Sequence, residues 1–155
     1  MNGNRLGKAK GWFQDGTLAW EADWKDDEPH GKYSEWYESG QIKSEKNLVV
    51  GIEEGLEVWW FEHGQKSWEV TWKEGRMTGM LVEWYENGKK TSETPYKAGQ
   101  RHGKATGWYQ NGKKSFEITY EADEETRHLE WSESGSPIDL TEEGWNPDGT
   151  PRKTK

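Results

Sequence analysis

The chain has 155 residues, of which 30% are apolar and 32% are charged, and its formal net charge at pH 7 is −8. The acidic balance disfavours nucleic acid and anionic lipid as partners, and the lack of cysteine excludes disulfides and thiolate metal sites. No apolar run approaches the roughly 20 residues of a membrane-spanning helix. Because the opening stretch, MNGNRLGKAKGW, also lacks the apolar middle of a secretion signal, we expect a cytoplasmic protein.

Aromatic residues compensate for the scarcity of Leu, Ile and Val. Twelve Trp, six Tyr and three Phe are spread along the chain. A composition this polar is otherwise typical of disordered segments. We therefore expect aromatic side chains to provide most of the packing.

A 24-residue period begins after a short N-terminal lead, residues 1–6. It is marked by a tryptophan row and a glutamate row: Trp12, Trp36, Trp60, Trp84 and Trp108, then Glu21, Glu45, Glu69, Glu93 and Glu117. A glycine lies four residues after each of these tryptophans. Self-similarity at a fixed period is typical of repeat architectures. In chain order the predicted repeat domain, residues 7–141, has units at 7–30, 31–54, 55–78, 79–102 and 103–126 and a degenerate sixth unit at 127–141, before a short terminal hairpin and basic tail at 142–155.

Each unit is predicted to contain a strand, a tight turn, a second strand and a connecting loop. Turn pairs such as Asn87-Gly88 are strong hairpin signals, and second arms such as SWEVTW (67–72) alternate between two faces. Pro95 cannot donate a ladder hydrogen bond, so we expect its strand to bulge or end early there. The sequence predicts an all-β fold, an elongated single-layer antiparallel meander of repeated β-hairpins with about twelve strands.

The turn length determines the predicted register. A two-residue type I′ loop at Asn87-Gly88 pairs Glu86 with Lys89 and places Glu83 opposite Ser92. The same count gives four further pairs: Gly11 with Trp20, Glu35 with Ser44, Trp59 with Trp68, and Gly107 with Phe116. Because an aromatic ring can cover a bare glycine, these pairs favour the two-residue loop. A three-residue loop with a bulge would instead flip every side chain.

With this register the two faces of the sheet differ. One face carries twelve further aromatic residues: Phe13, Tyr37, Phe61, Tyr85, Tyr109, Trp20, Trp24, Trp68, Trp72, Tyr96, Phe116 and Tyr120. The other face carries the tryptophan row interleaved with the glutamate row. The first, third and fifth repeats have an aromatic residue where the second and fourth have Ser44 and Ser92.

The units resemble MORN repeats, specifically the bacterial variant class. GMLVEWYENGKKTSETPYKAG (79–99) and GKATGWYQNGKKSFEITYEAD (103–123) carry the pattern best, and the resemblance covers residues 7–135. Arg127 and Ser132 depart from it, in place of the opening glycine and the second aromatic residue. Bacterial proteins that resemble this variant are often antitoxin or immunity components that neutralise a toxin by binding it. Eukaryotic MORN proteins use related repeats for scaffolding, for membrane association, or beside a catalytic domain.

Catalytic and metal sites are not predicted. His30 and His102 occupy equivalent positions about 30 Å apart by strand spacing, too far to share an ion, and we interpret all four histidines, with His63 and His128, as solvated turn residues. Neighbouring glutamates of the row stand about 10 Å apart, farther than the roughly 5–9.5 Å of glycosidase carboxylates. We expect them to pair with lysines across the strands, such as Lys10 opposite Glu21. No nucleophile or phosphate-loop motif occurs, so we expect neither an enzyme nor a cofactor.

The aromatic rows fit either packing or binding, because a one-layer sheet cannot bury both of its faces and exposed Trp and Tyr anchor protein interfaces. The candidate partner-binding residues are Trp12, Trp36, Trp60, Trp84, Trp108, Glu21, Glu45, Glu69, Glu93, Glu117, Tyr37, Tyr85 and Tyr109. We expect a non-enzymatic antitoxin or immunity protein with a basic toxin as its partner. The alternatives are a scaffold that forms a homo-oligomer through open sheet edges and a carbohydrate or peptide binder that uses the aromatic face.

Overall fold

The computed structural model describes residues 6–152 of the chain. It divides into two compact units, which are described separately: the first ends at Met77 and the second begins at Thr78. Residues 1–5 of the expected lead and residues 153–155 of the expected basic tail lie outside the described part. Within that part, no helix has the length and apolar character needed to span a membrane.

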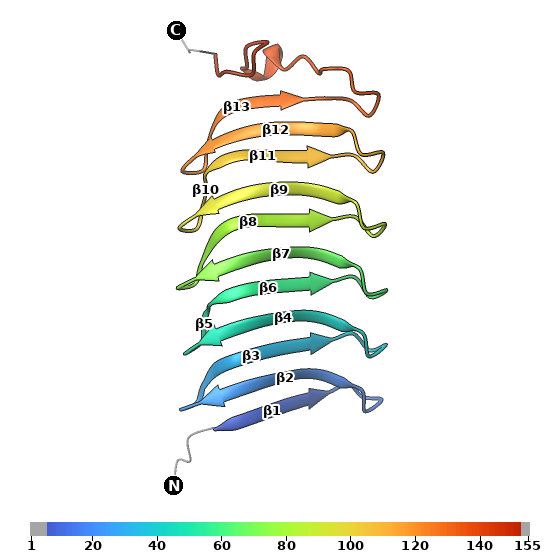
Figure 1. Ribbon diagram of the computed structural model, residues 1–155, viewed down its shortest axis with the longest axis vertical. Helices are drawn as coiled ribbons and strands as arrows, with labels where there is room; N and C mark the ends of the chain where they lie inside the picture. The colour runs from blue at the N-terminus through green and yellow to red at the C-terminus, as the bar shows by residue number, and fades with distance from the viewer. Residues whose placement is uncertain (1–5, 153–155) are drawn as a thin grey trace. The chain divides into compact units, whose positions relative to one another are not determined.

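The first unit is a series of antiparallel strands (Figure 1). They are β1 (Gly7–Trp12), β2 (Leu18–Lys25), β3 (Glu28–Trp36), β4 (Ile42–Val49), β5 (Ile52–Glu53), β6 (Gly55–Trp60) and β7 (Lys66–Lys73). Their order in the sheet is β1-β2-β3-β4-β6-β7, and the short β5 pairs with β4.

The second unit repeats this pattern. Its strands are β8 (Arg76–Trp84), which begins just before the boundary, β9 (Lys90–Lys97), β10 (Gln100–Arg101), β11 (Gly103–Trp108), β12 (Lys114–Glu121) and β13 (Glu124–Glu130). They are ordered β8-β9-β11-β12-β13, with β10 paired to β9. A single 3-10 turn, η1 (Thr141–Glu143), follows among the described residues.

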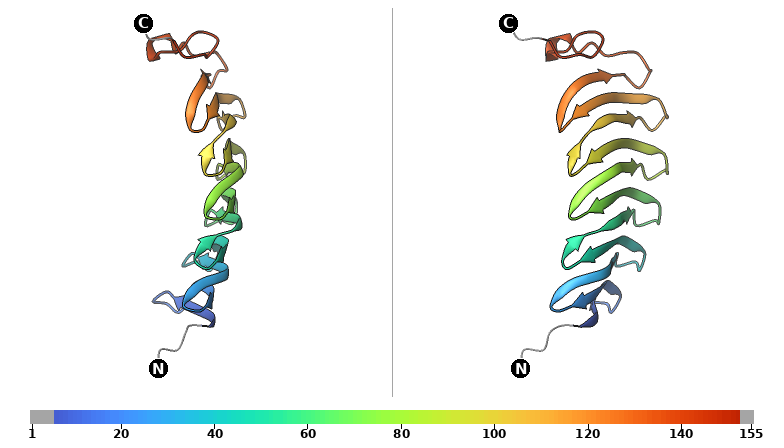
Figure 2. Two further views of the ribbon diagram at one scale, coloured as in Figure 1. Left: turned by 90° about the vertical axis from the view of Figure 1, so that its left-hand side faces the viewer. Right: turned by 60° about the vertical axis from the view of Figure 1, so that its left-hand side comes forward.

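The predicted fold class is confirmed. Both units consist of antiparallel hairpins in a sheet that is not closed, and Figure 2 shows one layer of strands in each unit. Residues 6–152 contain thirteen strands, more than the expected number of about twelve. Two connections each contain an extra two-residue strand, β5 and β10, whereas the sixth repeat lacks its returning strand.

Small buried side chains and half-buried rings make up the packing. The side chains of Ala22 and Val70 in the first unit and Ala105 in the second are at most 1% exposed. A Cβ atom on Gly107 would lie 2.1 Å from Cε1 of Phe116, because the ring covers the bare backbone as expected. The packing is thus between neighbouring strands, without a thick interior in either unit.

The predicted turn type is wrong. Gly88 N–H donates to the carbonyl of Tyr85 at 2.9 Å, and Tyr85 N–H donates to the carbonyl of Lys89 at 2.8 Å, which closes a three-residue loop. Gly88 has φ +81°, but Asn87 does not have positive φ, as a type I′ turn would require. The Asn87 side chain instead accepts a hydrogen bond from Lys89 N–H at 3.0 Å and so forms an Asx turn within the loop.

The predicted pair of Glu86 with Lys89 is therefore wrong, because Tyr85 lies opposite Lys89. The pairs farther from the turn are nevertheless confirmed, because a second irregularity compensates for the longer loop. In the fourth repeat Trp84 pairs with Lys90 and Glu83 pairs with Ser92, which leaves Thr91 as a bulge residue. The same shift restores the predicted register in the other hairpins: Gly11 with Trp20, Glu35 with Ser44, Trp59 with Trp68, and Gly107 with Phe116. The side chains therefore keep their predicted faces.

Type I′ turns occur at the opposite ends of the strands, in the connecting loops. Asp26 and Asp27 have φ of +52° and +69° and are flanked by the pair Lys25–Glu28, which defines a two-residue loop. The equivalent position in the second repeat is Val50, at φ +52°. A β-branched residue rarely adopts this conformation, and the Val50 side chain is also exposed.

The expectation for Pro95 is confirmed only in part: β9 does not end early there, but its register toward β10 and β11 shifts between Glu93 and Tyr96. β9 continues through Pro95 to Lys97, and Pro95 pairs in register with Met80. His102 N–H donates to the Pro95 carbonyl at 2.9 Å, just as Glu54 N–H donates to the Asn47 carbonyl at 3.0 Å in the second repeat. Because Asn47 occupies the same position, the local geometry belongs to the repeat and is not caused by proline.

The C-terminal segment retains the turns of the repeat but loses its strands. Trp131 bridges to Pro137 and Trp145 bridges to Pro151, each as a single isolated pair. The segment also covers the outer edge of β13, because His128 N–H donates to the Gly149 carbonyl at 2.8 Å and Ile138 N–H donates to the Glu130 carbonyl at 2.9 Å. Such covering satisfies part of an otherwise open strand edge.

Candidate functional site

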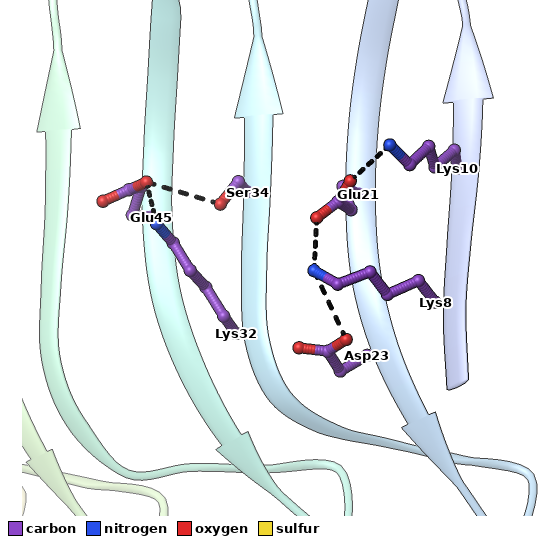
Figure 3. A network of polar contacts seen from close by, with 7 residues as sticks. All are labelled: Lys8, Lys10, Glu21, Asp23, Lys32, Ser34 and Glu45. Atoms are coloured by element: carbon purple, nitrogen blue, oxygen red, sulfur yellow. Dashed lines mark hydrogen bonds and ion pairs between the residues drawn. The ribbon is translucent and has the colours of Figure 1, made fainter. Parts of the chain in front are cut away.

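The glutamate row lies on the face that we call the glutamate face, and each of its members forms an ion pair. Figure 3 shows Glu21 between Lys8 and Lys10, at 2.6 and 2.7 Å, and Glu45 beside Lys32. The remaining pairs are Glu69–Lys66, Glu93–Lys90, Glu117–Lys104 and Glu117–Lys114. The expected pairing of Lys10 with Glu21 is confirmed.

These lysines stabilise the ionised carboxylates. Hydrogen bonds from Lys10 and then Lys8 lower the pKa of Glu21 to about 2. Lys114, and more weakly Lys104, lower the pKa of Glu117. The glutamate row is thus neutralised by lysines of its own sheet and offers little net charge to a partner.

The tyrosines of the predicted site connect successive repeats. Tyr37 O–H donates to the carbonyl of Trp60 at 2.7 Å in the first unit. In the second unit Tyr85 donates to the Trp108 carbonyl and Tyr109 to the Trp131 carbonyl, at 2.9 and 2.7 Å. Burial, followed by the charge of Glu62, raises the pKa of Tyr37. The only sequence signal for these bonds is the spacing between each tyrosine and the tryptophan of the next repeat.

The tryptophan row of the predicted site is only partly buried. The Trp12 side chain on β1 is 61% exposed. Trp36 and Trp60 in the first unit, and Trp84 and Trp108 in the second, are half-buried. Their rings therefore cover neighbouring strands and still leave surface for another molecule.

The opposite face, which we call the variable face, changes from repeat to repeat. In the first unit, one row across its strands contains Gly11, Trp20, Glu35, Ser44, Trp59 and Trp68. Ser44 O–H donates to Glu35 at 3.1 Å, and the rings of Trp59 and Trp68 stack with centroids 5.6 Å apart. In the second unit, Ser92 likewise donates to Glu83.

A buried carboxylate lies on the variable face of the first unit. Glu57 is 6% exposed and accepts the indole N–H groups of Trp59 at 2.9 Å and Trp72 at 2.7 Å. Two fixed donors partly offset the cost of burying this side chain. Glu57 was not among the predicted site residues because it does not belong to the periodic rows.

Both described units contain cavities. One of about 340 Å³ lies on the variable face of the first unit, and its walls include Tyr33, Glu35, Lys46 and Glu57. A second of about 370 Å³ lies at the first turn, beside Phe13 and Glu38. A third, of about 230 Å³, lies in the C-terminal part of the second unit. We call the first of these, the one with the densest set of charged and aromatic side chains, the acidic cleft.

The expectation of solvated turn residues is wrong for His30 and for His128. His30 is half-buried in β3, and His128 is also not in a turn. It lies in β13 with a side chain only 15% exposed, 3.3 Å from Glu125 and 3.0 Å from Glu130. Its ring also contacts Trp145 edge-on, with centroids 5.5 Å apart. No group of three His, Asp or Glu side chains within residues 6–152 is arranged to hold a metal ion.

Comparison with known proteins agrees with this repeat geometry. A family model described as the MORN repeat variant matches residues 29–49, 77–98 and 101–122. No significant match was found among curated proteins. Each matched segment covers most or all of one hairpin: β3–β4, β8–β9 and β11–β12. The chain is therefore a repeat protein that carries the MORN repeat variant at three positions.

Proposed function

We propose that this chain is a non-enzymatic cytoplasmic binding protein for a basic protein partner, and that it acts as an antitoxin or immunity protein that covers the working surface of a toxin. MORN repeats typically mediate binding, which supports the first part. The resemblance of the repeats to those of bacterial antitoxins motivates the second part.

The observation that carries the proposal is the composition of the variable face in the first unit. It presents the half-buried rings of Trp20, Trp59 and Trp68 beside a cleft with more carboxylates than lysines. Partly accessible aromatic rings provide contact area, and the negative charge steers a basic partner toward them. The glutamate face fits this role less well because lysines neutralise its carboxylates.

The proposal is tested by producing the chain together with the protein encoded by the neighbouring gene. We expect a stable complex whose affinity falls as salt rises, together with restored growth of cells that produce the toxin. Trp59→Ala should weaken binding by about 30-fold, as for a central interface tryptophan. Trp36→Ala, on the glutamate face, serves as the matched control. Binding independent of salt, or a greater loss for Trp36→Ala, would contradict the proposed surface.

A second candidate function is self-association through the edge of β1. Among the described residues, the C-terminal segment covers the edge of β13, whereas β1 pairs only with β2. An open edge can pair with the same edge of another copy, although Lys8 and Lys10 on β1 oppose this. Sedimentation velocity over a hundredfold range of concentration separates the two functions. A scaffold forms dimers as concentration rises, and an antitoxin remains monomeric without its partner.

A further inference from the structure

One place on the variable face departs from the chemistry of the repeat. Two positions that pair with each other across each hairpin form a row there. In the first, fourth and fifth repeats, this row contains small or apolar side chains and one threonine: Ala9, Ala22, Leu81, Thr94, Ala105 and Ile118. In the second and third repeats the same row contains Tyr33, Lys46 and Glu57. Folding does not require these polar residues, because the other repeats form the same hairpins without them.

These residues line the acidic cleft of about 340 Å³. Its walls include six charged or aromatic side chains: Tyr33, Glu35, Lys46, Glu53, Glu57 and Trp59. Three are carboxylates and one is an ammonium group, which lies 3.3 Å from Glu53. The cleft therefore has a formal excess of negative charge beside two aromatic rings.

The carboxylates are held in place and retain unused acceptor capacity. Tyr33 O–H donates to one oxygen of Glu35 at 3.0 Å, and Ser44 donates to the other at 3.1 Å. Each oxygen of Glu57 accepts one indole N–H. Because a carboxylate has about four acceptor positions, each of these groups can accept further bonds from a ligand rich in donors.

The Tyr33 ring is already used as a surface for a cation. Lys46 Nζ lies 5.7 Å from the centroid of this ring. Burial, and then the charge of Glu35, raises the pKa of Tyr33 to about 12, so its hydroxyl remains a neutral donor to Glu35 at physiological pH. The cleft thus combines fixed carboxylates with an aromatic wall that accommodates positive charge.

We propose that the acidic cleft binds the guanidinium group of an arginine side chain presented by the partner protein. A guanidinium is planar, stacks on aromatic rings and carries five N–H donors, which suits two or more carboxylates at once. This inference rests on the proposed function, in that a basic partner supplies the arginine. A neutral sugar would leave the excess of carboxylates without a matching charge.

The test uses the full chain and the peptide acetyl-Gly-Arg-Gly-amide as the probe. The indole N–H signals of Trp59 and Trp72 in ¹⁵N NMR spectra report on the cleft, because both groups bind Glu57. We expect these signals to shift saturably. The matched peptide with citrulline in place of arginine should bind about tenfold more weakly, because it lacks the charge-assisted bonds.

Variants taken from the chain's own repeats localise the site. Glu57→Leu introduces the residue found at the equivalent position 81, and we expect at least a tenfold loss of peptide affinity with an unchanged or higher urea midpoint. Glu35→Gln preserves the shape of the side chain and should also weaken peptide binding. It therefore tests the site even if Glu57→Leu fails to fold. Glu83→Gln is the control, because Glu83 occupies the equivalent position in the second unit and is likewise bonded by a serine. Its affinity should match that of the wild type.

Three outcomes would overturn the inference. They are equal shifts with arginine and citrulline peptides, an equal loss for Glu83→Gln, and shifts produced by maltotriose but not by the arginine peptide. Failure of the proposed function is distinguishable from these results. If the neighbouring gene product binds and the arginine peptide does not compete, the function stands and the cleft assignment fails. If the peptide binds as expected and no protein partner does, the cleft assignment stands and the function fails.

Discussion

The glutamate face and the variable face are built on the same strands but follow different rules. On the glutamate face a glutamate occurs at the same position in all five regular repeats, and each is paired with lysine. On the variable face the equivalent positions hold Tyr33, Glu57 and Ala105 in different repeats. A feature that recurs in every repeat is what the hairpin itself needs, whereas a feature present once is available for function.

The energetics of the two faces should differ accordingly. The ion pairs of the glutamate face are accessible to solvent, and such pairs contribute at most about 1 kcal/mol each. The variable face places rings directly on glycine backbone and buries Ser44 and Glu57. We therefore expect substitutions on the variable face to depend strongly on which repeat is changed. Four experiments test this contrast.

The largest effect is expected for Gly107→Val on the variable face. A Cβ at this position would lie 2.1 Å from the Phe116 ring, so the ring must move. The free energy of unfolding should fall by about 3 kcal/mol in urea titrations. Glu83→Ala changes the same position one repeat earlier and should cost only about 1 kcal/mol, the hydrogen bond to Ser92. Equal losses for the two variants would contradict the contrast between repeats.

Removal of one tyrosine hydroxyl should have a moderate effect. Tyr109→Phe loses the hydrogen bond to the Trp131 carbonyl. We therefore expect the free energy of unfolding to fall by about 1 kcal/mol. The reverse change is available in the first repeat, where Phe13 occupies the same position. Phe13→Tyr should raise the urea midpoint by adding the equivalent bond. An unchanged midpoint for Tyr109→Phe would show that these bonds do not stabilise the repeats.

A smaller gain is expected at the strained connecting turn. Val50 has φ +52°, a conformation that asparagine adopts more easily than a β-branched residue. Val50→Asn should increase the free energy of unfolding by about 0.5 kcal/mol. Ala98→Asn is the matched control, since Ala98 has φ +51° without a branched side chain. A larger gain at Ala98 than at Val50 would be inconsistent with strain from branching.

The smallest effect is expected for Glu21→Gln on the glutamate face, and it should depend on pH. The pKa of Glu21 is about 2 in the folded chain and about 4.3 for an ordinary glutamate. Its ion pairs therefore stabilise the fold above pH 4, and this contribution disappears as pH falls toward 2. Urea midpoints of wild type and variant should differ at pH 6 and converge near pH 2. Glu38→Gln at an exposed turn provides the control. A difference in urea midpoint between wild type and Glu21→Gln that persists at pH 2 would show that the ion pairs of Glu21 are not its cause.

The successes and failures of sequence reasoning have identifiable causes. The pairs Glu83–Ser92 and Gly107–Phe116 were predicted correctly because alternation and ring-over-glycine contacts constrain residues far from the turn. The turn at Asn87-Gly88 was predicted wrongly because a bulge at Thr91 cancels the difference between a two-residue and a three-residue loop. His128 was misplaced because the degenerate sixth repeat gives no register for it.

The sequence by itself determined the period, the antiparallel hairpins and the faces on which the tryptophan and glutamate rows lie. These depend on local alternation and on glycines at fixed spacing, which act within one hairpin. Only the tertiary structure decided that Glu57 would be held by Trp59 and Trp72 and that Tyr33 and Lys46 would line one cleft with it. The Glu57 bonds lie within the hairpin β6–β7, whereas the cleft joins that hairpin to β3–β4. The geometry of both depends on bulges and turns that the side-chain pattern does not encode.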